Sequence, residues 1–234
     1  DKIEPELSTV AADPPTQPEL APITPPEQAP SKPEATTKPL PAKVKQDDMA
    51  NLHTRRGNQI LFAEVTQTML QTPAVFKTTG DLMNGATRCI THGIGLPTSV
   101  VLLINQQRTR LKGFYATGTK SRPNLAKANI DLTEPGLFKT LMQKPSGIWV
   151  KPESSAKVHS MIPATFTEMN KTQDFFLMSC FVKNRPIALI YADGNVGKEA
   201  PHLTDYEYSC FKKVCGSVAQ VLVFLSQRQR AKTN

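Results

Sequence analysis

The sequence predicts a domain of the α+β class, in which helices cover an antiparallel sheet. Two long apolar runs, residues 175–182 and 187–192, face each other across a short polar stretch, as the strands of a β-hairpin do. Apolar residues recur at helical spacing near residues 60, 82 and 204. The chain has 234 residues, which is enough for one domain of ordinary size and an additional segment.

The hairpin is expected at the centre of the sheet. Neither apolar run alternates cleanly, which predicts that both faces of each strand are covered. Lys183, Asn184 and Arg185 supply a turn that permits only antiparallel pairing. Pro186 is tolerated because a proline at the first position of a strand removes a hydrogen-bond donor that the sheet can spare.

The other strands and helices are predicted from shorter patterns. Residues 99–105, 111–117, 128–132 and 147–150 are expected as strands, which gives six in all. The first helix begins at Asn58 and is ended by Pro73, and the second has Asp81 as its N-cap. Further helices are expected over residues 134–142, 158–169 and 203–228.

The last of these helices is announced by Thr204-Asp205-Tyr206-Glu207, which fits a capping box. Its apolar residues follow a 3-4-3-4-3 spacing that is typical of a coiled coil. They are Tyr208, Phe211, Cys215, Val218, Leu222 and Leu225. Two interpretations stay open: the stripe packs on the domain's own sheet, or the last five of these residues form the interface of a parallel homodimer, which we favour.

The first 46 residues contain 11 of the 20 prolines and neither glycine nor an aromatic residue. Such a segment cannot bury enough apolar surface to offset its chain entropy, so we expect a disordered tether. The predicted organisation is a linker at residues 1–57, a domain at 58–228 and a basic tail at 229–234.

Charge is distributed unevenly along the chain, whose net charge is +8. Residues 1–57 hold 7 basic and 9 acidic residues, which leaves 21 basic and 11 acidic residues in the remainder. A basic domain raises nucleic-acid binding as an alternative function. The basic residues lack an accompanying pattern of aromatics, however, which favours a solvated surface. No run reaches the roughly 18 apolar residues of a membrane span, so no membrane partner is expected.

Residues that could carry catalysis are not arranged in any known motif. His53, His92, His159 and His202 have no nucleophile or acid at a recognisable spacing, so no enzyme activity is expected. Cys89, Cys180, Cys210 and Cys215 form no C-x-x-C pair, which predicts no metal site and small buried side chains in a reducing, cytoplasmic compartment. Asp193-Gly194-Asn195 is interpreted as a turn, because the acidic spacing of a calcium loop is absent.

Four stretches together resemble a known family: DLTEPGLF (131–138), KPSGIW (144–149), FFLMS (175–179) and RPIALIYAD (185–193). They are similar to the GAF-like module found C-terminal to HDOD domains in Gram-negative signalling proteins, and the resemblance covers about residues 58 to 227. It implies a six-stranded antiparallel sheet with helices on both faces and a non-catalytic regulatory role, sensory or in dimerisation. It also implies an HDOD domain N-terminal to Asp1 and pairing into homodimers.

Three ligand-binding GAF subfamilies can be compared with this sequence. Asn170-Lys171 lacks the acidic pair of cyclic-nucleotide GAF domains, His159 has no neighbouring bilin-attaching Cys, and the four Cys do not form a methionine-sulfoxide-reducing cluster. The cofactor therefore stays unknown. The family's pocket position nevertheless implies a small-molecule site roofed by the helices near residues 138 and 161, with a core filled by side chains as the alternative. Its candidate lining residues are Phe138, Trp149, His159, Phe166, Phe176 and Met178.

Overall fold

A computed structural model describes residues 57–194 and 201–233. These described residues belong to one compact unit. The expected disordered tether falls on residues 1–56, which lie outside the described residues.

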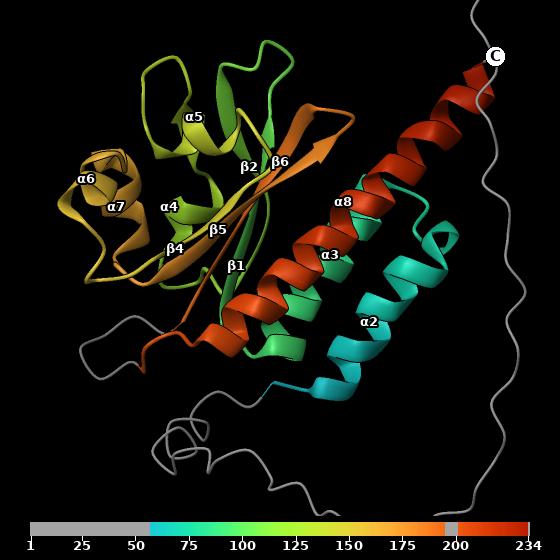
Figure 1. The fold of residues 1–234 in the computed structure, drawn as a ribbon, viewed down its shortest axis with the longest axis horizontal. Helices are drawn as coiled ribbons and strands as arrows, with labels where there is room; N and C mark the ends of the chain where they lie inside the picture. The colour runs from blue at the N-terminus through green and yellow to red at the C-terminus, as the bar shows by residue number, and fades with distance from the viewer. Residues whose placement is uncertain (1–56, 195–200, 234) are drawn as a thin grey trace, which may run out of the picture. The chain divides into compact units, whose positions relative to one another are not determined.

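The domain is built on one antiparallel sheet of six strands in the order β3-β2-β1-β6-β5-β4 (Figure 1). The strands are β1 (Thr98–Ile104), β2 (Arg110–Thr117), β3 (Asn129–Asp131), β4 (Gly147–Val150), β5 (Phe175–Val182) and β6 (Arg185–Asp193). β5 and β6 form the predicted central hairpin, and β6 also pairs with β1. The six predicted strands and their antiparallel pairing are thus confirmed.

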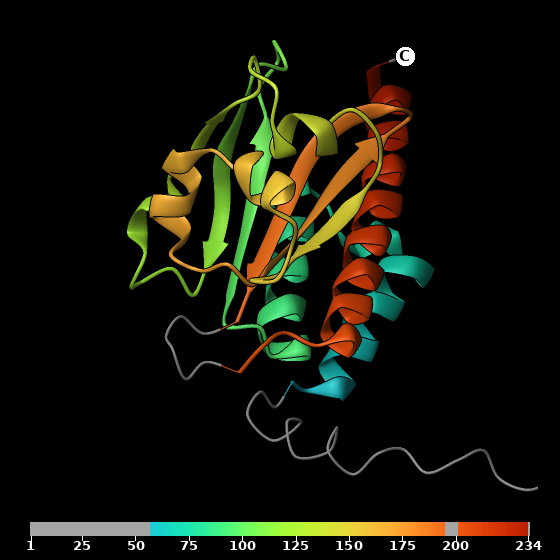
Figure 2. The same ribbon diagram turned by 60° about the vertical axis from the view of Figure 1, so that its left-hand side comes forward.

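Three long helical segments cover one face of the sheet, as Figures 1 and 2 show from two sides. They are α2 (Gln59–Gln71), α3 (Thr79–Arg88), which continues into the π-helix η3 (Cys89–Ile94), and α8 (Asp205–Thr233). A short 3-10 helix, η2 (Pro73–Val75), joins α2 to α3. Their inner side chains form a core with the sheet, which we call the helix-side core. It includes Leu82, Ile90, Phe176, Phe211 and Leu222.

The opposite face is covered by four short helices and their loops. They are α4 (Pro123–Ala126), α5 (Leu137–Leu141), α6 (Ala156–Ser160) and α7 (Ala164–Asn170). Together with the sheet they enclose a second core, which we call the loop-side core. It includes Val100, Leu111, Phe138, Phe166 and Tyr191.

Two local boundaries differ from the prediction. The helix expected over residues 158–169 is divided into α6 and α7, because Pro163 forms the N-cap of α7 and ends the preceding turn. The N-cap of α3 is Thr78 and not Asp81. Asp81 instead accepts a hydrogen bond from the Thr78 backbone and so completes a capping box.

The apolar stripe of α8 faces the domain's own sheet. Its five predicted dimer-interface residues, Phe211, Cys215, Val218, Leu222 and Leu225, are all buried in the helix-side core. α8 is long and apolar enough to cross a membrane by length and composition, but half of its most apolar window is buried inside the domain. The 3-4 spacing on this helix therefore serves packing within one chain, and an interface between chains must use another surface.

Candidate functional site

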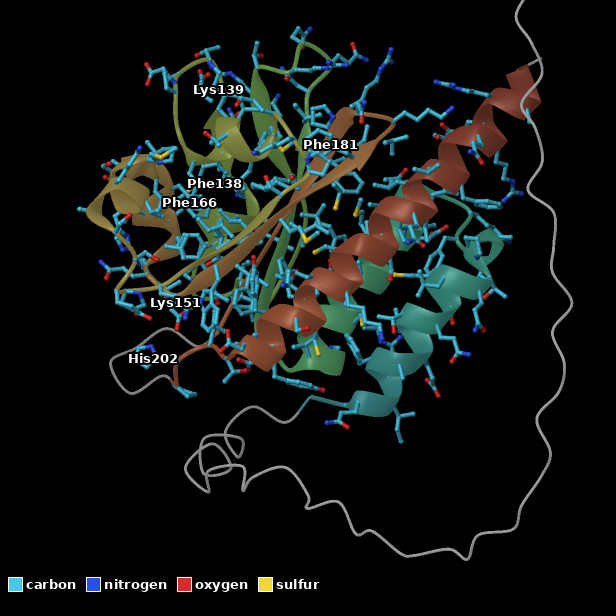
Figure 3. All side chains as sticks on the ribbon, in the orientation of Figure 1. Phe138, Lys139, Lys151, Phe166, Phe181 and His202 are labelled. Atoms are coloured by element: carbon cyan, nitrogen blue, oxygen red, sulfur yellow. The ribbon has the colours of Figure 1, made fainter. Side chains whose placement is uncertain are left out.

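The structure does not bring the six predicted pocket residues together. Phe138 and Phe166 lie side by side in the loop-side core, with ring centroids 4.8 Å apart (Figure 3). Trp149, Phe176 and Met178 pack in or against the helix-side core, on the other face of the sheet. His159 is half-buried on α6.

This division follows from strand geometry. Successive side chains of a strand point to opposite faces, so Phe176 and Met178 share one face while Phe175 and Leu177 share the other. Trp149 is opposite Phe176 in the β4–β5 ladder and lies on the same side. The grouping of these strand residues with Phe138 is thus corrected.

Four buried aromatic side chains pack together over the loop-side face of the sheet. Phe166 makes edge contacts with Phe138, Phe175 and Tyr191, at centroid distances of 4.8, 5.9 and 5.7 Å. All four residues are essentially inaccessible to solvent. Each such aromatic pair contributes about 0.5–1.5 kcal/mol beyond the burial of its area, so the cluster holds α5 and α7 firmly on the sheet.

A buried polar network adjoins this aromatic cluster. The Arg122 guanidinium forms a bidentate ion pair with Asp193, at 2.6 Å from Nη1 to Oδ2 and 2.9 Å from Nη2 to Oδ1. It also donates to the Asn170 carbonyl and to Thr98 Oγ1, each at 2.7 Å. The Tyr191 hydroxyl is in hydrogen-bond contact with both Asn170 and Asp193. The network ties together the start of β1, the loop before α4, the end of α7 and the end of β6.

Burial sets the electrostatics of this network. The side chains of Arg122 and Asp193 are 3% and 0% exposed. Burial raises the pKa of Asp193, against the opposing effect of Arg122. Burial, together with the neighbouring Asp193, also holds the pKa of Tyr191 well above its usual value, so the hydroxyl stays protonated and can donate. Among the described residues no partner meets Arg122 Nε, although that atom is buried.

The sequence does not predict the network, because its two charged members, Arg122 and Asp193, lie in segments interpreted as a polar loop and a turn. Arg122 falls in a stretch of Gly, Thr, Lys and Ser, and Asp193 was assigned to a turn. One signal was available. A carboxylate at the end of an almost wholly apolar strand needs a partner if that strand is buried on both faces.

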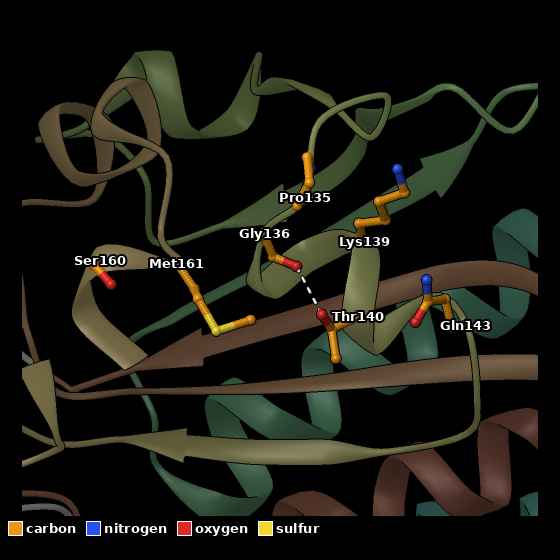
Figure 4. A pocket seen from close by; sticks show the side chains of 7 residues that line it. All are labelled: Pro135, Gly136, Lys139, Thr140, Gln143, Ser160 and Met161. Atoms are coloured by element: carbon orange, nitrogen blue, oxygen red, sulfur yellow. Dashed lines mark hydrogen bonds between the residues drawn. The ribbon is translucent and has the colours of Figure 1, made fainter. Parts of the chain in front are cut away.

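A shallow groove lies on the outer side of the loop-side layer, between α5 and the end of α6 (Figure 4). Its volume is about 380 Å³, and its lining residues are Pro135, Gly136, Lys139, Thr140, Gln143, Ser160 and Met161. It therefore lies between the segments near residues 138 and 161, as expected for a pocket, but none of the six predicted residues lines it.

The groove offers one cationic side chain and a few hydrogen-bonding groups. Lys139 is the one charged side chain among the described residues that line it, and its Nζ donates to the Thr133 carbonyl at 2.7 Å. Thr140 Oγ1 donates to the Gly136 carbonyl, so its lone pairs stay available as acceptors. Such a set could hold a small polar or anionic molecule by hydrogen bonds, but it includes no nucleophile with an adjacent base.

The four cysteines are all free and buried. Burial raises the pKa of the Cys89 and Cys180 thiols to about 12 and that of Cys215 well above its usual value. Within the described part of the chain, no group of three or more His, Cys, Asp or Glu side chains could hold a metal ion. The thiols are therefore protonated packing groups at neutral pH.

No family model and no curated protein matches this sequence. Solved structures do share its fold. Residues 122 to 287 of a methyl-accepting chemotaxis protein align with 72% of this chain and 99% of that chain, with a TM-score of 0.54 and 13% identity. Free methionine-R-sulfoxide reductase from Neisseria meningitidis aligns with 75% of this chain and 99% of its own, with a TM-score of 0.54 and 12% identity.

A GAF domain/HD domain protein from Geobacter sulfurreducens aligns over 64% of this chain and 94% of its own, at a TM-score of 0.50 and 12% identity. The fold is accordingly that of a GAF-like domain.

Proposed function

We propose that this chain is a non-catalytic regulatory module of a cytoplasmic bacterial signalling protein, with an HDOD-type domain preceding it. The observation that carries the proposal is the GAF-like fold, whose loop-side core contains packed aromatic side chains next to a buried ion pair. The close packing of these aromatic side chains supports regulation through surface contacts. The GAF domain/HD domain protein from Geobacter sulfurreducens, which combines a GAF domain with an HD domain, supports the proposal of a signalling domain beside this module.

The groove beside α5 is the place where we propose that a small ligand binds. Thermal-shift and native mass-spectrometry screens of cyclic nucleotides, haem and small metabolites test this, with Thr140→Trp to fill the groove. Thr167→Trp is the matched control, because both threonines are exposed on short helices and donate to the carbonyl four residues earlier. A ligand that binds Thr140→Trp as well as wild type would contradict the groove assignment.

The regulatory proposal has its own tests. We expect the coding sequence upstream of Asp1 to encode an HDOD domain, and its absence would overturn that part. Turnover of free methionine-R-sulfoxide by the purified chain would overturn the non-catalytic part. The burial and high pKa of its thiols are the reason to expect none.

We further propose that the module forms a homodimer through the outer face of α2, since the stripe on α8 is buried. Ile60, Ala63, Gln67 and Leu70 repeat at 3-4-3 spacing and are all exposed. The two apolar ends of this stripe, Ile60 and Leu70, are 71% and 46% exposed. Exposed apolar side chains at helical spacing are typical of a helix that pairs with another.

Light scattering at tens of micromolar tests this interface. We expect wild type to be a dimer and Ile60→Glu/Leu70→Glu to be a monomer of unchanged fold, because both side chains are exposed. Phe114→Glu is the control, since Phe114 is 50% exposed on β2, away from α2. A monomeric wild type, or a dimeric double variant, would refute the interface.

A further inference from the structure

The topology collects basic side chains at one end of the domain. Antiparallel pairing places the β5–β6 turn at the end of the sheet opposite Asp193, and both views show the tip of this hairpin beside the C-terminal half of α8 (Figures 1 and 2). Lys77, which precedes α3, lines the same hollow as Arg228 of α8. We call this surface the basic end. It consists of Lys77, Lys183, Arg185, Arg228 and Arg230, all of which are exposed.

No acidic side chain in the described part of the chain neutralises the charge of the basic end. None of its five cations forms an ion pair with any of the described acidic residues. Residues 73–80, 182–187 and 222–231, which carry these cations, include no acidic residue. The nearest carboxylate along the chain is Asp81, which is engaged in the capping box of α3.

Part of this surface is held rigidly. Lys183 and Asn184 both have positive φ, of 47° and 62°, and form a two-residue turn between paired Val182 and Arg185. This is the turn geometry that matches the twist of a hairpin, so Lys183 and Arg185 are fixed relative to each other. Arg228 and Arg230 lie on the last turns of α8, which is anchored by the buried Leu222 and Leu225.

We propose that the basic end binds the phosphate backbone of a nucleic acid. Its cations come from three separate segments, an arrangement that suits a row of phosphates better than a single small anion. Three of the five are arginines, whose planar guanidinium matches phosphate oxygens in pairs. The β5–β6 turn and residues 226–230 are wholly polar, which favours a polyanion over a lipid surface. Val75 is the exposed apolar residue near Lys77, so vesicle binding is measured alongside.

The binding mode makes a quantitative prediction. Contacts to phosphates release counterions, so the slope of log affinity against log salt is about −0.9 per contact on duplex DNA. Three to five contacts predict that raising salt from about 50 to 200 mM weakens binding between about 40- and 500-fold. Because only the backbone is contacted, affinity is expected to be independent of sequence.

Fluorescence anisotropy with labelled duplexes of about 30 base pairs tests the proposal on the whole chain. The variants Lys183→Glu/Arg185→Glu and Arg228→Glu/Arg230→Glu are each expected to reduce the salt slope by about 2 while keeping the wild-type melting temperature. Lys120→Glu/Lys157→Glu changes the net charge equally at exposed positions outside the basic end and is expected to bind like wild type.

Three results would overturn the proposal. They are no duplex binding at about 50 mM salt, an equal loss in the control variant, and binding to vesicles of about 30% phosphatidylserine in phosphatidylcholine without binding to duplex. None of them bears on the regulatory fold or on the α2 interface, because those are tested on other residues.

Discussion

Asp193→Asn is expected to destabilise the domain strongly, because it leaves the Arg122 guanidinium buried without an anion. The Arg122 side chain is 3% exposed and its pKa is raised, so the guanidinium cannot escape by losing its proton. Breaking a buried pair by removing one partner costs about 3–5 kcal/mol. For a domain of this size, a loss of 1 kcal/mol in the free energy of unfolding lowers the melting temperature by about 2–4 °C, so the melting temperature should fall by about 6–20 °C.

Thermal unfolding followed by circular dichroism measures this effect, with Arg110→Met as control. Arg110 pairs with Asp131 at 3.5 Å, and both side chains are 48% exposed, so the control should change stability by at most about 1 kcal/mol. The double variant Arg122→Met/Asp193→Leu should be more stable than Asp193→Asn, because it removes both charges. If Asp193→Asn melts within the range of Arg110→Met, the network is not a buried ion pair in solution and the reasoning fails.

Three other outcomes follow from burial. In Arg122→Met the pKa of Asp193 should rise further, since burial persists while the opposing effect of the Arg122 guanidinium is lost. A carboxyl whose folded pKa is raised loses stability as pH rises through that pKa, so the deficit against wild type in thermal melts should be smaller at pH 5 than at pH 8. Alkylation mapped by mass spectrometry should modify Cys210 first, because it is 9% exposed and the other thiols are fully buried. Leu222→Glu/Leu225→Glu should unfold the domain and not merely dissociate it, which circular dichroism would show.

The parts of the fold that sequence could predict are those specified by local chemistry. The central hairpin was evident from two apolar runs around Lys183 and Asn184, and the start of α8 from Thr204 and Glu207, whose side chains do form a capping box. The sequence did not indicate on which face of the sheet each aromatic side chain of β5 lies. Phe175 and Phe176 are adjacent in a run that is apolar on both sides, so composition cannot tell which of them faces the loop-side core.

The site was harder to predict than the fold for a related reason. Arg122 and Asp193 are 71 residues apart. Arg122 lies in a segment with the composition of a loop, whereas Asp193 ends an apolar strand. Their pairing depends on the tertiary arrangement of four segments, which no local pattern encodes. The coiled-coil spacing on α8 predicted an interface between chains, whereas its stripe packs on the domain's own sheet. The spacing cannot separate the two cases, because a helix that crosses a sheet buries the same 3-4 stripe as one that pairs with another helix.

β6 runs from the basic end of the domain to the buried network of Arg122 and Asp193. Its first residue, Arg185, belongs to the basic end, and its last, Asp193, anchors the buried network. Between these two residues β6 pairs with both β1 and β5 and is buried from Ala188 onward. Because it is packed on all sides, we expect β6 to bend little and so to carry little conformational change from one end of the domain to the other. A module built on so rigid a strand is expected to act by presenting fixed surfaces. The groove, the α2 stripe and the basic end are such surfaces, and they are carried by different elements, so a partner at one need not compete for the residues of another.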